Sequence, residues 1–224
     1  TTTAAELAYA LARSGARVLA LDLDQQGNLT TRLGVTRDTE VEATAADLLT
    51  GEATAGHAAV ASPTVSGVDV VAGTSQLAAV EHMPEITAAL RTELSKLTEW
   101  DAVVIDTPPA LGVITLAALA AADTIVAPVA CEAEAYEQLT RLGVFVSGRV
   151  SRVAPGAHIA AVIPTRYDSR RRLDREVVDL LSEMPEAARA EWLDRHCPDV
   201  DLRQRVERLL QAQARTADPL AVAP

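Results

Sequence analysis

The sequence predicts an α/β fold with a doubly wound, mostly parallel sheet and helices on both faces. Short apolar segments alternate with longer segments of helical periodicity, which is the pattern of such folds. The apolar segments are nearly continuous, as is typical of strands buried on both faces. The 224 residues are 49% hydrophobic but only 3% aromatic. One domain over residues 1–224, with a core of alanine, valine and leucine, is therefore expected.

The expected elements follow from these patterns in chain order. In the first helix Ala4, Leu7, Ala8 and Leu11 recur at helical spacing, threonines before it can cap it, and Gly15 can end it. Strands are expected at residues 17–23, 68–73, 101–106, 123–129 and 158–164. Further helices are expected at residues 43–49, 84–97, 113–122, 133–150 and 171–181. Residues 183–224 lose the strand rhythm and predict a polar, helical C-terminal part.

Charge and cysteine content limit the function classes. A net charge of −11 argues against a chain that coats nucleic acid with its whole surface. One segment, residues 166–175, is nevertheless rich in arginine, and it fits either a phosphate-binding patch or an ordinary solvated helix start. Cys131 and Cys197 form no CxxC motif, which favours a reducing cytoplasm and a buried Cys131. The longest apolar stretch, residues 112–122, is too short to span a bilayer.

Three carboxylates are expected at one edge of the sheet. Asp22 and Asp24 end the first strand, and Asp106 ends the third. Ligands of open parallel sheets bind at the carboxyl ends of the strands. A carboxylate cluster there suits a site for Mg²⁺ and a nucleotide, but solvated strand ends would give the same pattern. Spacing alone leaves both interpretations open.

Three blocks of sequence resemble one family. They are "TTTAAELAYALARSGARVLALDLDQQGN", "DAVVIDTPPALGVITLAALAAADTIVAPVACE" and "IPTRYDSRRRLDREVVDLL", and they occur in family order up to about Leu181. The family is that of the ParA/Soj-type DNA-partition ATPases, the deviant Walker A class of the MinD/ParA superfamily. The resemblance implies a P-loop NTPase fold, with ATP or ADP and Mg²⁺ as cofactors.

The resemblance also implies roles for individual residues. Asp24 matches the catalytic aspartate that positions the attacking water, and Asp106 matches the carboxylate that holds Mg²⁺ through water. Thr1 matches a hydroxyl ligand of Mg²⁺, and Thr2 matches a phosphate contact. The other implied nucleotide contacts are Asp22, Gln26, Gly27, Asn28 and Pro108. Gln25 stands where the family usually has proline.

The main departure from the family lies at the start of the chain. The family's "KGGVGK" run, and the strand before it, do not occur in residues 1–224. We therefore expect a chain truncated at its N-terminal strand. ATP hydrolysis is expected of the full-length protein, whereas the chain as given is expected to be inactive.

The function that the resemblance implies is ATP-dependent partition of a plasmid or chromosome in the cytoplasm, on the nucleoid. ATP would form a nucleotide-sandwich homodimer, which would bind double-stranded DNA without sequence preference and without any membrane. A ParB-like adaptor would stimulate hydrolysis. The candidate DNA contacts are Arg170, Arg171, Arg172 and Arg175.

Two alternatives to this function stay open. One alternative is a MinD-like positioning ATPase of the membrane surface, which should carry a C-terminal amphipathic helix. The other is a truncated scaffold without catalytic activity.

Overall fold

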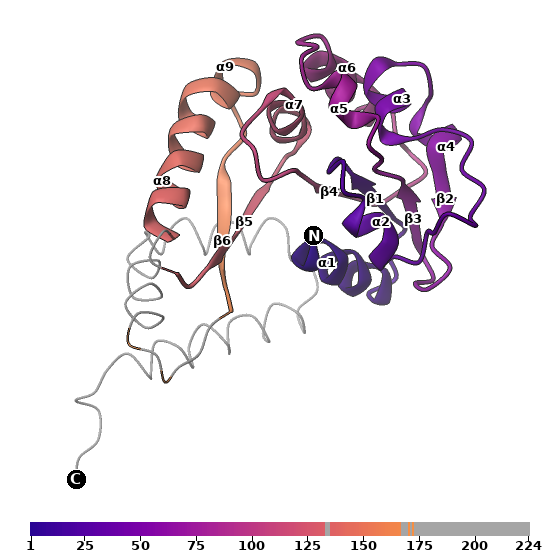
Figure 1. Cartoon of the computed structure of the whole chain (residues 1–224), viewed down its shortest axis with the longest axis horizontal. Coiled ribbons are helices and arrows are strands. Elements are labelled where there is room, and N and C mark those ends of the chain that lie inside the picture. The colour runs from indigo at the N-terminus through magenta and orange to yellow at the C-terminus, as the bar shows by residue number, and fades with distance from the viewer. Residues whose placement is uncertain (133–134, 167–169, 171, 173–224) are drawn as a thin grey trace. The chain divides into compact units, whose positions relative to one another are not determined.

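A computed structural model describes residues 1–132, 135–166, 170 and 172. These residues fall into two compact units (Figure 1). The first contains Thr1–Asp123 and Leu142–His158. The second contains Thr124–Arg141 and the described residues from Ile159 onward. A single domain over residues 1–224, with a divergent part at 183–224, stays a prediction.

The first unit is built on a four-stranded sheet. Its strands are β1 (Val18–Asp22), β2 (Ala59–Ala61), β3 (Val68–Val71) and β4 (Ala102–Asp106). They are arranged in the order β2-β3-β1-β4, and β1 pairs in parallel with both β3 and β4. Only β2 runs antiparallel to its neighbour β3 in this sheet. The mostly parallel sheet is therefore confirmed.

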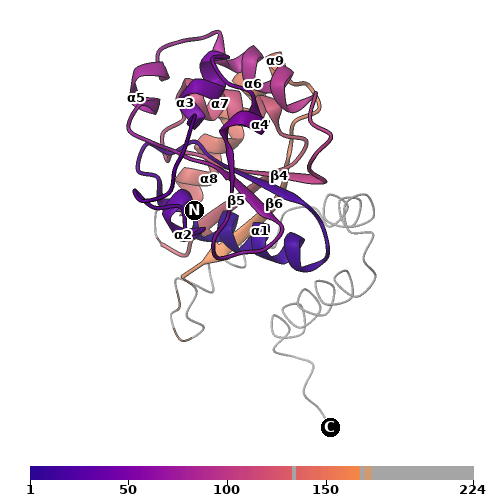
Figure 2. The same cartoon turned by 90° about the vertical axis from the view of Figure 1, so that its right-hand side faces the viewer.

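Helices cover both faces of this sheet, as predicted (Figures 1 and 2). Val18 and Ala20 of β1 point to the face covered by α1 (Thr2–Arg13) and α2 (Asn28–Arg32). Leu19 and Leu21 point to the opposite face. The helices packed there are α3 (Ala45–Thr50), α5 (Leu77–Val80), α6 (Ile86–Leu94) and α7 (Val113–Ala121), with the short α4 (Ala55–Ala58) beside them. Every residue of β1 is buried, which explains its continuous apolar sequence.

The ends of α1 match the sequence pattern only in part. Gly15 has φ +97°, and its N–H donates to the carbonyl oxygen of Ala12, so glycine ends the helix as predicted. The prediction that threonine side chains cap its start is wrong. Thr1 is the N-cap residue but makes no side-chain capping hydrogen bond, and Thr2 already lies inside the helix.

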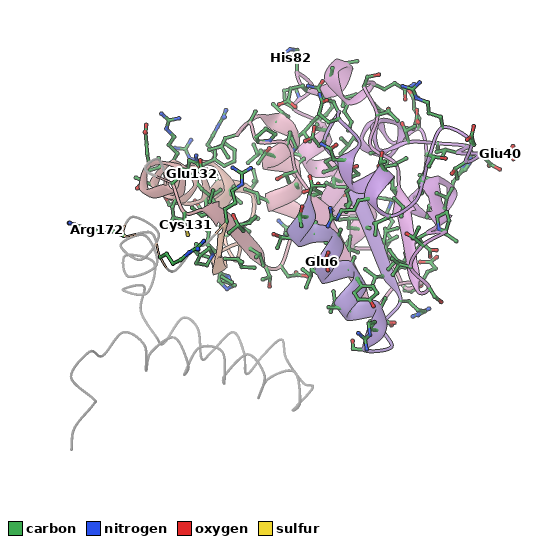
Figure 3. The ribbon with its side chains drawn as sticks, turned by 60° about the horizontal axis from the view of Figure 1, so that its bottom comes forward. Glu6, Glu40, His82, Cys131, Glu132 and Arg172 are labelled. Atoms are coloured by element: carbon green, nitrogen blue, oxygen red, sulfur yellow. The ribbon has the colours of Figure 1, made fainter. Side chains whose placement is uncertain are left out.

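The second unit contains a separate two-stranded sheet. β5 (Ile125–Ala130) and β6 (Ile159–Thr165) pair in parallel, and α8 (Ala135–Phe145) begins in this unit. Cys131 is buried beside Val129 and Val162 and forms no disulfide with a described residue, as expected of a small apolar side chain. Figure 3 labels it next to Glu132, whose Oε1 accepts a hydrogen bond from Arg166 Nη1 at 2.8 Å.

Several elements were not predicted. The antiparallel strand β2 is too short to show a period, and α2 has the polar sequence NLTTR. The helix predicted at 133–150 is observed from residue 135 as α8, but it continues as a π-helix (Val146–Val150) and a final turn, α9 (Ser151–Val153), which were not predicted. The predicted helix at 171–181 lies outside the described residues. Within the described part of the chain, no helix has both the length and the apolar character needed to cross a membrane.

Candidate functional site

The carboxyl ends of β1 and β4 meet at one edge of the first unit's sheet. Asp22 lies opposite Asp106 in the register of the two strands. One residue further on, the N–H of Leu23 donates to the carbonyl oxygen of Asp106 at 2.9 Å. Asp24 follows at once and is itself buried. The predicted placement of the three carboxylates at one edge is therefore confirmed.

Asp22 is fully buried and is held by several hydrogen bonds. Its Oδ2 accepts from the N–H of Thr30 at 2.8 Å and from the Thr30 hydroxyl at 2.7 Å. Its Oδ1 accepts from the N–H of Asp24 at 3.2 Å. Burial raises the pKa of Asp22; the hydrogen bonds from Thr30 and Asp24 oppose this shift, and the nearby charge of Asp106 adds to it. Both oxygens of Asp22 are thus used to hold the loop after β1.

The loop after β1 folds back on Asp24. The Asp24 Oδ1 accepts from the N–H of Gln26 at 3.0 Å, and the Asp24 carbonyl oxygen accepts from the N–H of Gly27 at 3.0 Å. Gly27 adopts φ +63° and is the N-cap residue of α2. Gln26 and Asn28 are exposed on either side of it. The turn therefore fixes the Asp24 side chain relative to the edge of the sheet.

Gly73, just after β3, is the third member of this hydrogen-bond network, with Asp22 and Thr30. Its N–H donates to the Thr30 hydroxyl oxygen at 2.9 Å, so Thr30 joins the ends of β1 and β3. A Cβ at Gly73 would lie 2.7 Å from the carbonyl oxygen of Asp22, and one at Gly27 would lie 2.8 Å from that of Gly73. Neither Thr30 nor Gly73 was predicted as part of the site. A glycine directly after an apolar strand is the signal that could have pointed to close backbone contact.

Asp106 lies beside the start of α1. Its Oδ1 is 2.8 Å from the backbone nitrogen of Thr1, and its side chain is only 8% exposed. Its Oδ2 is buried and has no hydrogen-bond partner among the described residues. The first N–H groups of α1 have no acceptor within the helix, and the Thr1 side chain does not supply one. A buried carboxylate oxygen without a partner, next to a helix amino terminus, fits a metal ion with bound phosphates.

The remaining predicted residues occupy different places. Thr1 and Thr2 are exposed at the start of α1, and Pro108 is half-buried in the loop after β4. Arg170 and Arg172 are exposed in the second unit, whereas Arg171 and Arg175 lie outside the described residues. No cluster of three or more acidic, histidine or cysteine side chains in the described ranges could hold a metal by itself. A metal at Asp106 would therefore need hydroxyl, phosphate or water oxygens as further ligands, which suits Mg²⁺.

Comparisons with known proteins decide the family. A family model described as "AAA domain" matches residues 1–152. The chain is 38% identical over 184 residues to the chromosome partitioning protein ParA of Caulobacter vibrioides, covering 79% of this chain and 68% of that protein. The chain belongs to the ParA/Soj family of partition ATPases. It is also 36% identical over 184 residues to the sporulation initiation inhibitor protein Soj of Bacillus subtilis, covering 80% of this chain and 72% of Soj.

A solved structure supports the same ParA/Soj-type fold. It is that of cobyrinic acid a,c-diamide synthase from Mycobacterium smegmatis with bound ADP and magnesium. The two chains superpose with a TM-score of 0.73 at 32% sequence identity, covering 83% of this chain and 76% of the other. The P-loop NTPase fold of the MinD/ParA superfamily, implied by the sequence motifs, is therefore confirmed.

Proposed function

We propose that the full-length form of this ParA/Soj-type protein binds ATP and Mg²⁺ at the edge formed by β1, β4 and the start of α1, and that it hydrolyses ATP. The observation that carries the proposal is Oδ2 of Asp106, which is buried next to the amino terminus of α1 and has no hydrogen-bond partner in the described part of the chain. The similar synthase from Mycobacterium smegmatis was solved with ADP and magnesium, which supports the same ligands here.

Each side chain at this edge has a proposed part in binding or hydrolysis. Asp106 would hold Mg²⁺ through its water shell, and Mg²⁺ would neutralise charge on the phosphates. Thr1 would add a hydroxyl oxygen to the metal's ligands. The N–H groups of the first turn of α1, Thr2 among them, would donate to phosphate oxygens. Gln26, Gly27, Asn28 and Pro108 remain proposed nucleotide contacts from the two loops.

Asp24 would act on water rather than on the nucleotide. Its Oδ1 is held by the N–H of Gln26, so the carboxylate has a fixed direction at the edge of the sheet. A carboxylate in such a position can accept a hydrogen bond from the attacking water and orient it toward the phosphorus atom. Asp22 was also predicted as a nucleotide contact. Its hydrogen bonds to Thr30 and Asp24 indicate that its main part is to hold Asp24 in place.

The wider function that we propose is partition of plasmid or chromosomal DNA on the nucleoid. ATP would bring two copies together as a homodimer, the dimer would bind double-stranded DNA without sequence preference, and a ParB-like adaptor would stimulate hydrolysis. The similarity to ParA of Caulobacter vibrioides supports this role. The arginines at 170, 171, 172 and 175 are the proposed phosphate contacts, because attraction to DNA must be local in a chain of net charge −11.

The division of roles between Asp24 and Asp106 can be tested in the protein as its gene encodes it. Asp24→Ala should keep ATP affinity but lower hydrolysis by about 100-fold or more. Asp106→Ala should weaken binding of ATP in the presence of Mg²⁺. Asp38→Ala, which removes an exposed carboxylate from the loop after α2, is the control and should change neither. Equal loss of ATP affinity in the Asp24 and Asp106 variants would contradict the proposal.

The DNA contacts can be tested by salt titration of the ATP-bound protein. Arg171→Ala combined with Arg172→Ala should weaken binding to all DNA sequences by a similar factor. Each lost phosphate contact should flatten the slope of log affinity against log salt by about 1. The control combines Arg13→Ala with Arg37→Ala, two exposed arginines of the first unit. An unchanged slope and affinity in the Arg171 and Arg172 variant would show that the patch does not carry DNA binding.

A further inference from the structure

The first N–H of helix α7 donates a hydrogen bond to a distant carboxylate. Glu81, which directly follows α5, accepts from the N–H of Val113 through its Oε1 at 2.9 Å, across 32 residues of sequence. Val113 is the first residue of α7, and its N-cap residue, Gly112, has no side chain to supply a cap. A carboxylate at this position satisfies an N–H that has no acceptor in the helix and is favoured by the helix dipole.

The neighbouring Gly112 leaves the space in which the Glu81 carboxylate lies. Its φ of −92° and ψ of −160° form an extended backbone conformation that any residue can adopt. A Cβ at this position, however, would lie 1.8 Å from Oε1 of Glu81. An alanine at this position would therefore force the end of the flexible Glu81 side chain to move away, although the backbone itself would accept any residue.

The contact lies at the far end of the loop that follows Asp106. This loop, residues 107–112, contains Pro108 and ends where Glu81 binds α7. A second side chain supports the same end, because the buried Thr115 hydroxyl donates to the carbonyl oxygen of Ala110 at 2.5 Å. The start of the loop is fixed by the pairing of β4 with β1. Glu81 thus adds a hydrogen bond to this end of the loop from an element other than β4 and α7.

We propose that Glu81 is a positioning residue for ATP hydrolysis, acting through the loop at 107–112. The proposal rests on the proposed function, because the loop begins at Asp106, the residue assigned to the Mg²⁺ shell. Glu81 does not touch the reacting atoms; it sets where the loop lies relative to them. Loss of the carboxylate should displace the loop, and small displacements of a positioned group reduce the rate of the chemical step.

The test compares variants of Glu81 with a matched control in the protein as its gene encodes it. Glu81→Ala should lower kcat for ATP hydrolysis at least about tenfold with a smaller change in KM, while Glu81→Gln, which keeps an oxygen acceptor, should restore most of the activity. The control is Glu93→Ala. Glu93 Oε1 makes a similar contact, accepting from the N–H of Ala55 at 3.1 Å at the start of α4. Glu93→Ala should leave kcat unchanged, since α4 carries no residue of the site.

Gly112→Ala provides a second, independent variant. Its added Cβ should expel the Glu81 carboxylate and reproduce the loss seen in Glu81→Ala. In the double variant the space is already empty, so Gly112→Ala should cause little further loss. Additive losses would overturn the proposal, as would equal kcat losses in Glu81→Ala and Glu93→Ala.

Hydrogen exchange separates failure of this inference from failure of the proposed function. Glu81→Ala should speed amide exchange at residues 110–113, and Glu93→Ala should not. An inactive wild-type protein would refute ATP hydrolysis and any catalytic part for Glu81, while the exchange experiment would still decide whether Glu81 holds the loop. Unchanged exchange in Glu81→Ala would overturn the positioning role regardless of activity.

Discussion

Replacement of Thr30 by valine tests the network that holds the edge of the sheet. Valine has nearly the shape of threonine but has no hydroxyl. The substitution removes the 2.7 Å hydrogen bond to Oδ2 of Asp22 and leaves the N–H of Gly73 without its 2.9 Å acceptor. The network is buried, so water does not replace the lost partners.

The expected loss of stability follows from these two bonds. A hydrogen bond to a charged group contributes about 1.5–3 kcal/mol, and a buried N–H left without an acceptor costs about 1–3 kcal/mol. The two bonds share one hydroxyl, so we expect Thr30→Val to lower the free energy of unfolding by about 3 kcal/mol. Thr30→Ser keeps the hydroxyl and should lose only about 1 kcal/mol, for the missing methyl group.

Urea denaturation at neutral pH, with a check that the m-value is unchanged, measures this difference. The neighbouring Thr31 is the matched control. It is exposed, and its hydroxyl donates to the carbonyl oxygen of Gly27 at 3.0 Å, so Thr31→Val should cost less than about 1 kcal/mol. A loss in Thr30→Val no greater than that in Thr31→Val would refute the reasoning.

Two further predictions concern backbone packing and charge. Gly73→Ala should cost at least about 2 kcal/mol, because its Cβ would lie 2.7 Å from the carbonyl oxygen of Asp22; thermal unfolding measures this loss. Its control is Gly56→Ala in α4, where a Cβ meets no atom within 4 Å and unfolding should shift little. Hydrogen bonds from Arg17 lower the pKa of Asp101 to about 2, so Arg17→Ala should raise that pKa toward 3.8 in a carboxyl NMR titration. The pair stabilises the fold above the unfolded-state pKa, and this contribution is lost as the pH falls from 3.8 toward about 2. An unchanged Asp101 titration would show that Arg17 is not the cause.

The sequence was sufficient to predict the strands and the carboxylate edge. The strands from β1 to β6, apart from β2, were predicted because each is an apolar run between polar residues. The juxtaposition of Asp22 and Asp106 followed from the rule that parallel strands present their carboxyl ends together. These features depend on local composition and on the direction of the chain, and both can be read from sequence.

The contacts that hold the edge could not be predicted in the same way. Thr30 contacts Gly73 across 43 residues, and Glu81 contacts Val113 across 32. Such pairs depend on strand register and on loop paths, which periodicity does not specify. Glycine after a strand or before a helix shows that space is restricted, but it does not identify the neighbouring group.

The segment from Gly73 to Glu81 supports two loops at once. Its first residue binds Thr30, in the helix after β1, and its last residue binds the start of α7, after β4. It carries none of the proposed catalytic or nucleotide-binding groups. The two regions that do carry them are both held to it by hydrogen bonds, one at Gly73 and the other at Glu81. For protein engineering, this segment and the two regions bound to it depend on one another's contacts and form a single module. A chimera with another family member should therefore take residues 22–31, 73–81 and 106–115 from the same parent.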